Sequence, residues 1–176
     1  MGKNLVARLQ NALKKRKYRI LLAASVGSVL LDQATKLWVI DAFRLGESVP
    51  VISNYFNLTY VRNTGAAFGL LADAHPAFRV PFFLIVPVVA LVIIGGILKK
   101  LPDGNIRMSL ALSLVVGGAV GNLIDRAYLG YVVDFLDFHW RYQTHFPAFN
   151  IADTAISVGV GLMMLDLLLE KHPTEQ

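Results

Sequence analysis

The chain has 176 residues, of which 55% are hydrophobic and 16% charged, and its mean hydropathy of +0.54 lies outside the usual balance of a soluble domain. This composition predicts a small integral membrane protein made of one domain. The net charge of +5 does not indicate a nucleic-acid binder, because seven basic residues precede Ile20 and leave the rest of the chain at −2. The absence of cysteine excludes disulfides, thiolate catalysis and cysteine metal sites.

The basic N-terminal segment is followed by an apolar run over residues 20–31. This order resembles a secretory signal, but polar residues at 32–36 stand where a small-residue cleavage site would be expected. We therefore interpret the run as the first membrane helix, which is retained. Before it, leucines spaced among basic residues at 5–13 suit an amphipathic helix lying on an anionic leaflet, and a solvated tail is the alternative.

Four stretches are long and apolar enough to cross the bilayer as helices, since about 30 Å of hydrocarbon takes roughly 17 to 25 residues. They cover residues 20–40, 79–98, 107–127 and 151–170. No internal repeat or long linker divides the chain. The predicted fold class is therefore an all-α membrane protein with four transmembrane helices in one domain over residues 1–176.

The orientation follows from the basic residues of the short loops, because Lys and Arg accumulate on the cytoplasmic side of a membrane. The N-terminal cluster marks one side, together with Lys99, Lys100 and Arg107. Four spans then place both termini in the cytoplasm and residues 41–78 and 128–150 outside.

The first outer segment contains a short stretch with a period of two. Large apolar side chains alternate with smaller or polar ones from Phe56 to Tyr60. Such alternation is typical of a strand with one apolar face, so we expect a small sheet at the membrane surface.

Ionisable side chains at the centre of a membrane helix cost roughly 2.5 to 3.5 kcal/mol each, so each requires a partner or a function. In the first span, Asp32 and Lys36 are four residues apart on one helical face and can pair. An ion pair that only neutralises itself and a role in a functional site both remain open.

The third span combines small residues with a polar end. The glycines between Gly117 and Gly121 allow another helix to approach closely. Asn122 and Asp125 then lie three residues apart on one face and are followed by Arg126. An amide at Asn122 needs hydrogen-bond partners inside the bundle, and a purely structural bond would satisfy it.

Two more acids, Asp134 and Asp137, follow in what we expect to be an outer loop, where carboxylates commonly face water. The fourth span opens with Asn150 and Asp153. Asn150 suits a helix N-cap and Asp153 suits the first turn, where the helix dipole favours a negative charge. Capping alone would explain both residues.

Capping does not explain why so many polar residues gather near the outer ends of the spans, namely Asp32, Asn63, Asn122, Asp125, Arg126, Asp134, Asn150 and Asp153. Two aspartates that lie close together cannot both ionise cheaply, so one keeps a proton. The pair can then supply a general base for water and a general acid for a leaving group. This pattern predicts peptide hydrolysis by paired aspartates, but the spacing leaves open which of Asp125, Asp134 and Asp137 partners Asp153.

Other functions are less well supported by the residues. The four histidines, at 75, 139, 145 and 172, show no paired ligand spacing such as HExxH, and no GxSxG nucleophile motif is present. A small transporter or proton relay is the main rival, because intramembrane Asp, Lys and Asn can line an ion path. Against it, the acids gather at one side of the membrane. A non-catalytic packing partner would leave the polar cluster without a purpose.

Five short motifs follow one another along the chain: LDQATK at 31–36, VRNTGAAF at 61–68, GNLIDR at 121–126, VVDF at 132–135 and FNIADT at 149–154. In order, spacing and four-span layout, they resemble lipoprotein signal peptidase, or signal peptidase II, the aspartic peptidase family A8. The resemblance covers nearly the whole chain. It implies four transmembrane helices with a small extracytoplasmic β-cradle, which the strand near residue 56 would join.

The resemblance also implies a role for each polar residue. The catalytic pair would be the aspartate of VVDF with that of FNIADT, hence Asp134 with Asp153. The supporting or substrate-orienting residues would be Asp32, Lys36, Asn63, Asn122, Asp125, Arg126 and Asn150.

The implied substrate is a prolipoprotein whose cysteine already carries diacylglycerol, cut on the amino side of that cysteine. A lipid anchor would hold the scissile bond at one leaflet, which lowers the entropic barrier. We further expect a monomer in the lipids of the bacterial inner membrane, and the predicted orientation of the spans places its active site near the outer leaflet. The resemblance implies neither a metal nor an organic cofactor.

Overall fold

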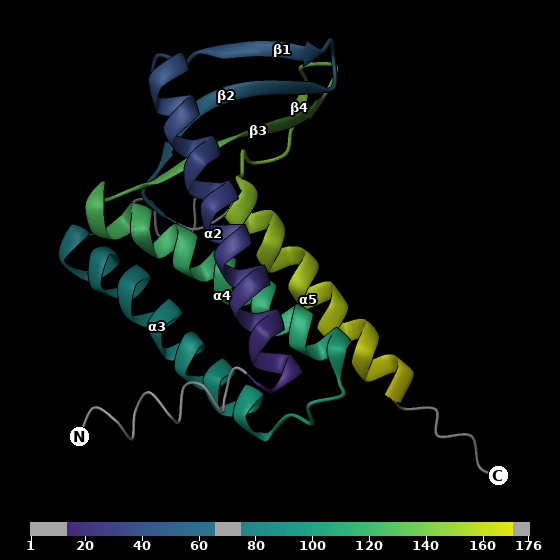
Figure 1. Ribbon diagram of the computed structural model, residues 1–176. Coiled ribbons are helices and arrows are strands. Elements are labelled where there is room, and N and C mark those ends of the chain that lie inside the picture. Colours follow the sequence, from purple (N-terminus) through teal and green to yellow (C-terminus); the bar gives the residue numbers. More distant parts are fainter. Residues whose placement is uncertain (1–13, 66–74, 171–176) are drawn as a thin grey trace.

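The computed structural model describes residues 14–65 and 75–170 (Figure 1). Its helices are α2 (Arg16–Ala42), α3 (Pro76–Lys100), α4 (Ile106–Tyr128) and α5 (Ile151–Glu170). Each is long and apolar enough to cross a membrane, which confirms the four predicted spans, with ends that extend up to four residues beyond the predicted limits. The amphipathic helix predicted at 5–13 lies outside the described residues.

Helix α4 is the centre of the bundle and packs against α2 and α5 (Figure 1). Half of its most apolar stretch is buried by protein, against 6% of the corresponding stretch of α3. The glycines predicted to allow close packing do so. A Cβ atom at Gly117 would lie 2.7 Å from the Cβ of Ser28 on α2, and one at Gly118 would overlap the carbonyl oxygen of Ala152 on α5.

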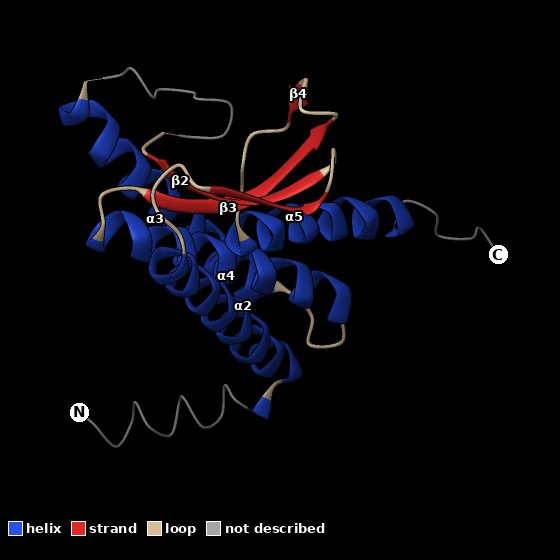
Figure 2. Ribbon diagram, turned by 90° about the horizontal axis from the view of Figure 1, so that it is seen from above, coloured by secondary structure: helices blue, strands red, loops and turns tan. Residues whose placement is uncertain are grey.

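A four-stranded antiparallel sheet lies beyond one end of the helices, in the order β1 (Ser48–Ile52), β2 (Phe56–Asn63), β3 (Val132–Trp140) and β4 (Thr144–His145) (Figure 1). Figure 2 shows it from above, with β2 and β3 running side by side. The predicted strand at residues 56–60 is confirmed as part of β2. The all-α description is thus completed by the small sheet that the resemblance implied.

The expectation of an outer loop around Asp134 and Asp137 was wrong, because both residues lie on β3. Residues 132–135 of this strand are all buried, so apolar side chains occupy both faces and the period of two disappears from the sequence. The three-residue spacing of the two aspartates directs them to opposite faces of the sheet.

The sheet is attached to the helices through an apolar cluster at the end of α2. Val39 packs there with Tyr60 of β2 and with Val133 and Phe135 of β3, and all four side chains are at most 3% exposed. Asp134 lies between two of these residues on β3. The cluster therefore fixes the strand on either side of an acid.

Candidate active site

The centre of the polar cluster is the ammonium group of Lys36 on α2. Its Nζ lies 2.8 Å from Asp32 Oδ2 and 2.9 Å from Asp125 Oδ2, and donates a 2.9 Å hydrogen bond to Asn122 Oδ1. Lys36, Asp32 and Asp125 are each at most 2% exposed. Three acceptors match the three N–H donors of the ammonium group, so this buried cation is fully satisfied.

The two acids beside Lys36 also hold the starts of two other elements. Asp32 Oδ1 accepts the backbone N–H of Ala152 at 2.9 Å, and Asp125 Oδ2 accepts that of Val133 at 3.0 Å. The next residues along the chain are Asp153 and Asp134. The cluster around Lys36 therefore positions the two remaining aspartates through the backbone.

Gln33 belongs to the same cluster, although sequence reasoning did not single it out. Its Nε2 donates to Asp125 Oδ1 at 2.9 Å and to Asp32 Oδ2 at 3.2 Å, which joins α2 to α4. The sequence does contain a signal for Gln33: a side-chain amide next to Asp32 in a membrane helix needs a hydrogen-bond partner within the protein, because lipid offers none.

Two asparagines connect Lys36 to the second pair of aspartates. Asn122 Nδ2 donates to Asp153 Oδ1 at 2.8 Å, while Asn150 Nδ2 donates to Asp134 Oδ1 at 2.7 Å and to Asn122 Oδ1 at 3.2 Å. Asn63, at the end of β2, donates to the other oxygen of Asp134 at 2.9 Å. All these donors are uncharged amides.

The predicted capping of α5 is confirmed and takes a reciprocal form. The Asp153 N–H donates to Asn150 Oδ1 at 2.9 Å, and the Asn150 N–H donates to Asp153 Oδ2 at 3.3 Å. These bonds satisfy backbone donors at the helix start and hold the Asp153 carboxylate in one orientation. Capping and a role in the site are thus compatible.

Asp134 and Asp153 differ from the acids around Lys36 in their electrostatics. Among the described residues, no Lys or Arg forms an ion pair with either of them. Burial and the neighbouring charge of Asp153 raise the pKa of Asp134 to about 7, against the lowering effects of its bonds from Asn63 and Asn150 and of the Lys36 charge. At neutral pH, a substantial fraction of Asp134 is therefore protonated, whereas a carboxyl group with an ordinary pKa would be almost fully ionised.

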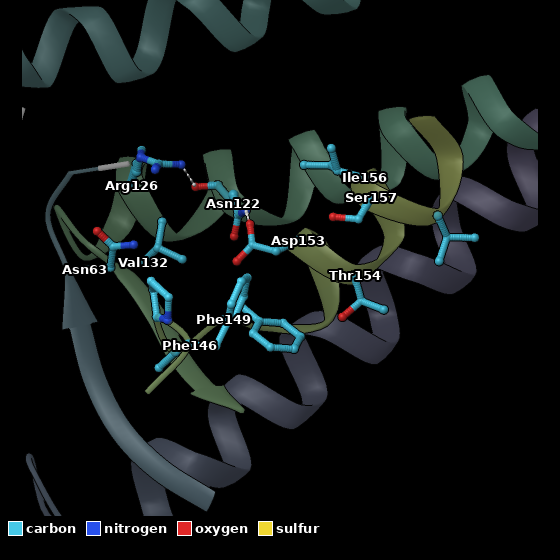
Figure 3. A pocket seen from close by; sticks show the side chains of 13 residues that line it. Asn63, Asn122, Arg126, Val132, Phe146, Phe149, Asp153, Thr154, Ile156 and Ser157 are labelled. Carbon is cyan, nitrogen blue, oxygen red and sulfur yellow. Dashed lines mark hydrogen bonds between the residues drawn. The ribbon is translucent and has the colours of Figure 1, made fainter. Parts of the chain in front are cut away.

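Asp153 faces a pocket of about 530 Å³ (Figure 3). The polar end of the pocket has Asn63, Asn122 and Arg126, and most of the remaining wall is apolar, made by residues 146–149 and the first turns of α5. Arg126 donates to the carbonyl oxygens of Asn122 (3.5 Å) and Gly65 (3.2 Å). It thereby closes the polar end of the pocket.

All nine site residues expected from the sequence belong to one connected group, whereas Asp137 does not. Asp137 lies on the opposite face of β3 from Asp134 and pairs with His145 at 3.0 Å. Asp125 forms an ion pair with Lys36. Of the three acids left open as partners of Asp153, only Asp134 shares a hydrogen-bonding amide with it through Asn150.

Four membrane-spanning helices hold two carboxylates that are bound by amides, and one of them lines an apolar pocket, which is the arrangement of a membrane-embedded enzyme of the aspartic hydrolase type. Residues 24–169 match the family described as signal peptidase (SPase) II. The chain therefore belongs to the signal peptidase II family.

Named relatives and a solved structure agree with this family. The chain is 49% identical to a lipoprotein signal peptidase of Geobacter sulfurreducens over 90% of its own length and 97% of the relative's, and 44% identical to one of Pasteurella multocida over 86% and 90%. A bacterial membrane enzyme solved by the in meso method superposes with a TM-score of 0.79 at 35% identity, over 89% of this chain and 92% of the other.

Proposed function

We propose that this membrane-embedded aspartic peptidase removes signal peptides from prolipoproteins with Asp134 and Asp153 as its catalytic pair. The observation that carries the assignment is the shared hydrogen bonding of these two acids through Asn150, at an apolar pocket and without an ion-paired cation among the described residues. The acids around Lys36 have the opposite character, because both are ion-paired with its ammonium group.

The proposed mechanism assigns different roles to the two aspartates. Asp153 faces the pocket and, as the ionised partner, accepts a proton from the attacking water. Asp134, whose pKa is raised to about 7, donates its proton to the oxygen of the scissile carbonyl. When the C–N bond breaks, Asp153 passes its proton to the leaving amine, and Asp134 takes a proton back from a hydroxyl group of the gem-diol intermediate as the carbonyl forms again.

The shape of the pocket supports a lipid-modified substrate. Aromatic and aliphatic side chains from 146–149 and from Ile156 and Val158 form a wall suited to acyl chains, next to the polar end that Asp153 faces. We propose that the diacylglyceryl group of the prolipoprotein cysteine lies along this wall. The peptide bond on the amino side of that cysteine would then meet Asp153.

Cleavage of a diacylglyceryl-modified prolipoprotein by purified protein in detergent tests the catalytic pair. Asp134→Asn and Asp153→Asn are each expected to reduce the rate by at least about 10³-fold, since a proton donor or acceptor is lost. Asp41→Asn, which changes an exposed aspartate on α2, is the matched control and should keep the wild-type rate. Cleavage by either variant at the wild-type rate would refute the assignment. The absence of cleavage by the wild type would reopen the transporter alternative.

We further propose that the chain acts as a single domain and a monomer in membrane lipid, with both termini in the cytoplasm and the catalytic pair near the outer leaflet. The basic residues near the N-terminus support this orientation, as do Lys99 and Lys100 at the end of α3 and Arg107 at the start of α4. Because the chain has no cysteine, a single cysteine introduced at the exposed Gln143 reports its side cleanly. Labelling from the cytoplasmic side alone would contradict the orientation, and a dimer mass in light scattering would contradict the monomer.

A further inference from the structure

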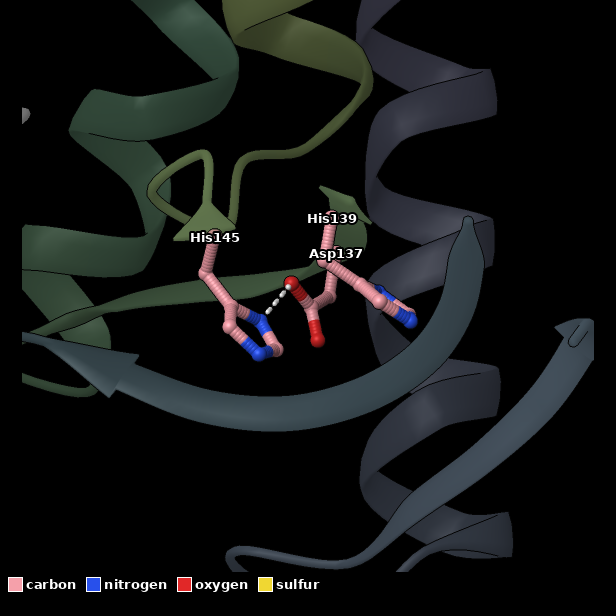
Figure 4. Close-up of side chains that lie close together, drawn as sticks. All are labelled: Asp137, His139 and His145. Atoms are coloured by element: carbon pink, nitrogen blue, oxygen red, sulfur yellow. Dashed lines mark hydrogen bonds and ion pairs between the residues drawn. The ribbon is translucent and has the colours of Figure 1, made fainter. Parts of the chain in front are cut away.

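The hairpin of β3 and β4 brings together three side chains that the proposed peptidase mechanism does not use. Asp137 and His139 are two residues apart on β3 and therefore point to the same face of the sheet. His145 on β4 is the direct cross-strand partner of His139, so its side chain lies on that face as well. Figure 4 shows the three side chains gathered at the hairpin.

Their atoms have the spacing of a metal site that needs little adjustment. One ligand atom from each residue lies within 4.8 Å of the others, and His145 Nδ1 is 3.0 Å from Asp137 Oδ1. Ligand bonds of about 2.1 Å in a tetrahedral site would set neighbouring ligand atoms roughly 3.4 Å apart. The half-exposed side chain of His145, on a two-residue edge strand, can rotate to close the remaining distance.

A second, independent observation is the state of His139. Its side chain is buried, with the residue 6% exposed, yet neither ring nitrogen has a hydrogen-bond partner among the described residues. It packs against the rings of Tyr142 and His145, at centroid distances of 4.4 and 4.9 Å. Burying an imidazole without any hydrogen bond is unfavourable. A bound cation would use the lone pair of the ring nitrogen that carries no hydrogen.

The same region contains one more buried polar atom without a partner in the described part of the chain, Asn57 Oδ1. Asn57 is the cross-strand partner of Asp137 on β2, so its amide lies on the same face as the three candidate ligands. All the buried side-chain atoms left without a partner in residues 14–65 and 75–170 thus belong to His139 and Asn57. An unmet demand for hydrogen bonding is concentrated where two histidines and a carboxylate meet.

We propose that Asp137, His139 and His145 bind a divalent transition-metal ion, with Zn²⁺ the best match to two imidazoles and one carboxylate. This ligand set is typical of zinc sites, and Asn57 Oδ1 or water can complete the coordination. The ion is structural and separate from the chemistry at Asp134, which lies on the opposite face of β3.

The site would act on the pocket by holding β4 against β3. His145 directly precedes the wall formed by residues 146–149, and the Phe146 N–H donates to the Phe138 carbonyl at 2.8 Å. Arg141 and Tyr142 in the connecting turn have φ values of 50° and 57°, which are unfavourable for residues with side chains. A metal bond across the hairpin would offset this strain and keep the pocket wall in place.

Binding of Zn²⁺ to untagged, chelator-stripped full-length protein in detergent, in competition with a chromogenic chelator, is the direct test. One equivalent should bind to the wild type, and His145→Gln and Asp137→Asn should each weaken binding by at least about tenfold. The exposed His75, which caps α3, gives the matched control His75→Asn with unchanged affinity. The proposal would be overturned if the wild type did not bind Zn²⁺, or if the two ligand variants bound it with the affinity of the wild type.

Two further readouts do not depend on substrate cleavage, and the first needs no variant. X-ray absorption of the Zn²⁺-loaded wild type should show two imidazole ligands with oxygen ligands, and a spectrum without imidazole would overturn the site. Hydrogen exchange at the Phe146 amide should slow on Zn²⁺ addition in the wild type and stay unchanged in His145→Gln. Equal slowing in both proteins would refute the role of the hairpin. Loss of prolipoprotein cleavage would leave these outcomes unaffected.

Discussion

Two groups of acids lie on either side of Asn122 and Asn150. Asp32 and Asp125 contact the ammonium group of Lys36 and also accept backbone N–H groups. Asp134 and Asp153, further along the same hydrogen-bond network, receive only amide and backbone donors among the described residues.

We infer that this difference separates an architectural group from the proposed catalytic pair. A buried carboxylate that is ion-paired and hydrogen-bonded has its oxygens occupied and is held in place. A buried carboxylate beside a like charge keeps a proton near neutral pH and can exchange it with a substrate. The asparagines let the first group position the second without neutralising it, because an amide donates a hydrogen bond but carries no charge.

The largest expected effect is on stability, from Lys36→Met. Removing the cation leaves Asp32 and Asp125 buried without a counter-charge, so the free energy of unfolding should fall by about 3 to 5 kcal/mol. Denaturant unfolding in detergent measures this change. Lys100→Met, at an exposed position at the end of α3, is the control and should remain close to the wild type. Equal midpoints for the two variants would contradict the architectural role.

A second test distorts the same group by adding one methyl. In Gly121→Ala the new Cβ would lie 2.6 Å from Asp32 Oδ2, and Asp32 cannot withdraw while it binds Lys36 and Ala152. Overpacking of this kind costs about 1 to 3 kcal/mol in unfolding free energy. Gly27→Ala on α2 has open space around its Cβ and should be neutral or slightly stabilising. A stable Gly121→Ala protein would show that the group around Lys36 tolerates displacement.

Asp153→Asn should behave in the opposite way to the first two changes. It removes one of two neighbouring negative charges, so the unfolding free energy is expected to stay the same or rise by up to about 1 kcal/mol while cleavage is lost. Unfolding and cleavage measured on one preparation give both values. A loss of stability as large as that of Lys36→Met would mean that both groups of acids are architectural.

The smallest effect concerns pH. Asp134 holds its proton below its pKa of about 7 and loses it above, so the cleavage rate should decline as the pH rises through about 7. The Asn63 bond favours the charged form, and Asn63→Ala should raise this pKa and move the decline to higher pH by up to about one unit. The pH–rate profile of kcat/KM measures the midpoint. Gln143→Ala should leave it in place, and an unmoved midpoint in Asn63→Ala would refute the proton assignment.

Much of the fold was predictable because membrane helices depend on local composition. Runs of apolar residues predicted all four spans, and the glycines of α4 indicated its close packing against other helices. Strand β3 escaped prediction because it is buried on both faces, so its residues show no alternation. The histidine pair across the β3–β4 hairpin escaped for a related reason: cross-strand register, and not spacing along the chain, brings His139 opposite His145.

The sequence by itself determined the membrane class, the spans and a short set of polar residues that lipid cannot satisfy, and its motifs identified the family. Physical reading alone left three candidates for the partner of Asp153. The family motifs pointed to Asp134, and the tertiary structure adds contacts that support the proposed pair: Asp125 turns toward Lys36, Asp137 points to the other face of β3, and Asp134 shares Asn150 with Asp153. Which charge neutralises which acid depends on contacts between residues up to 120 positions apart, and no local pattern encodes them.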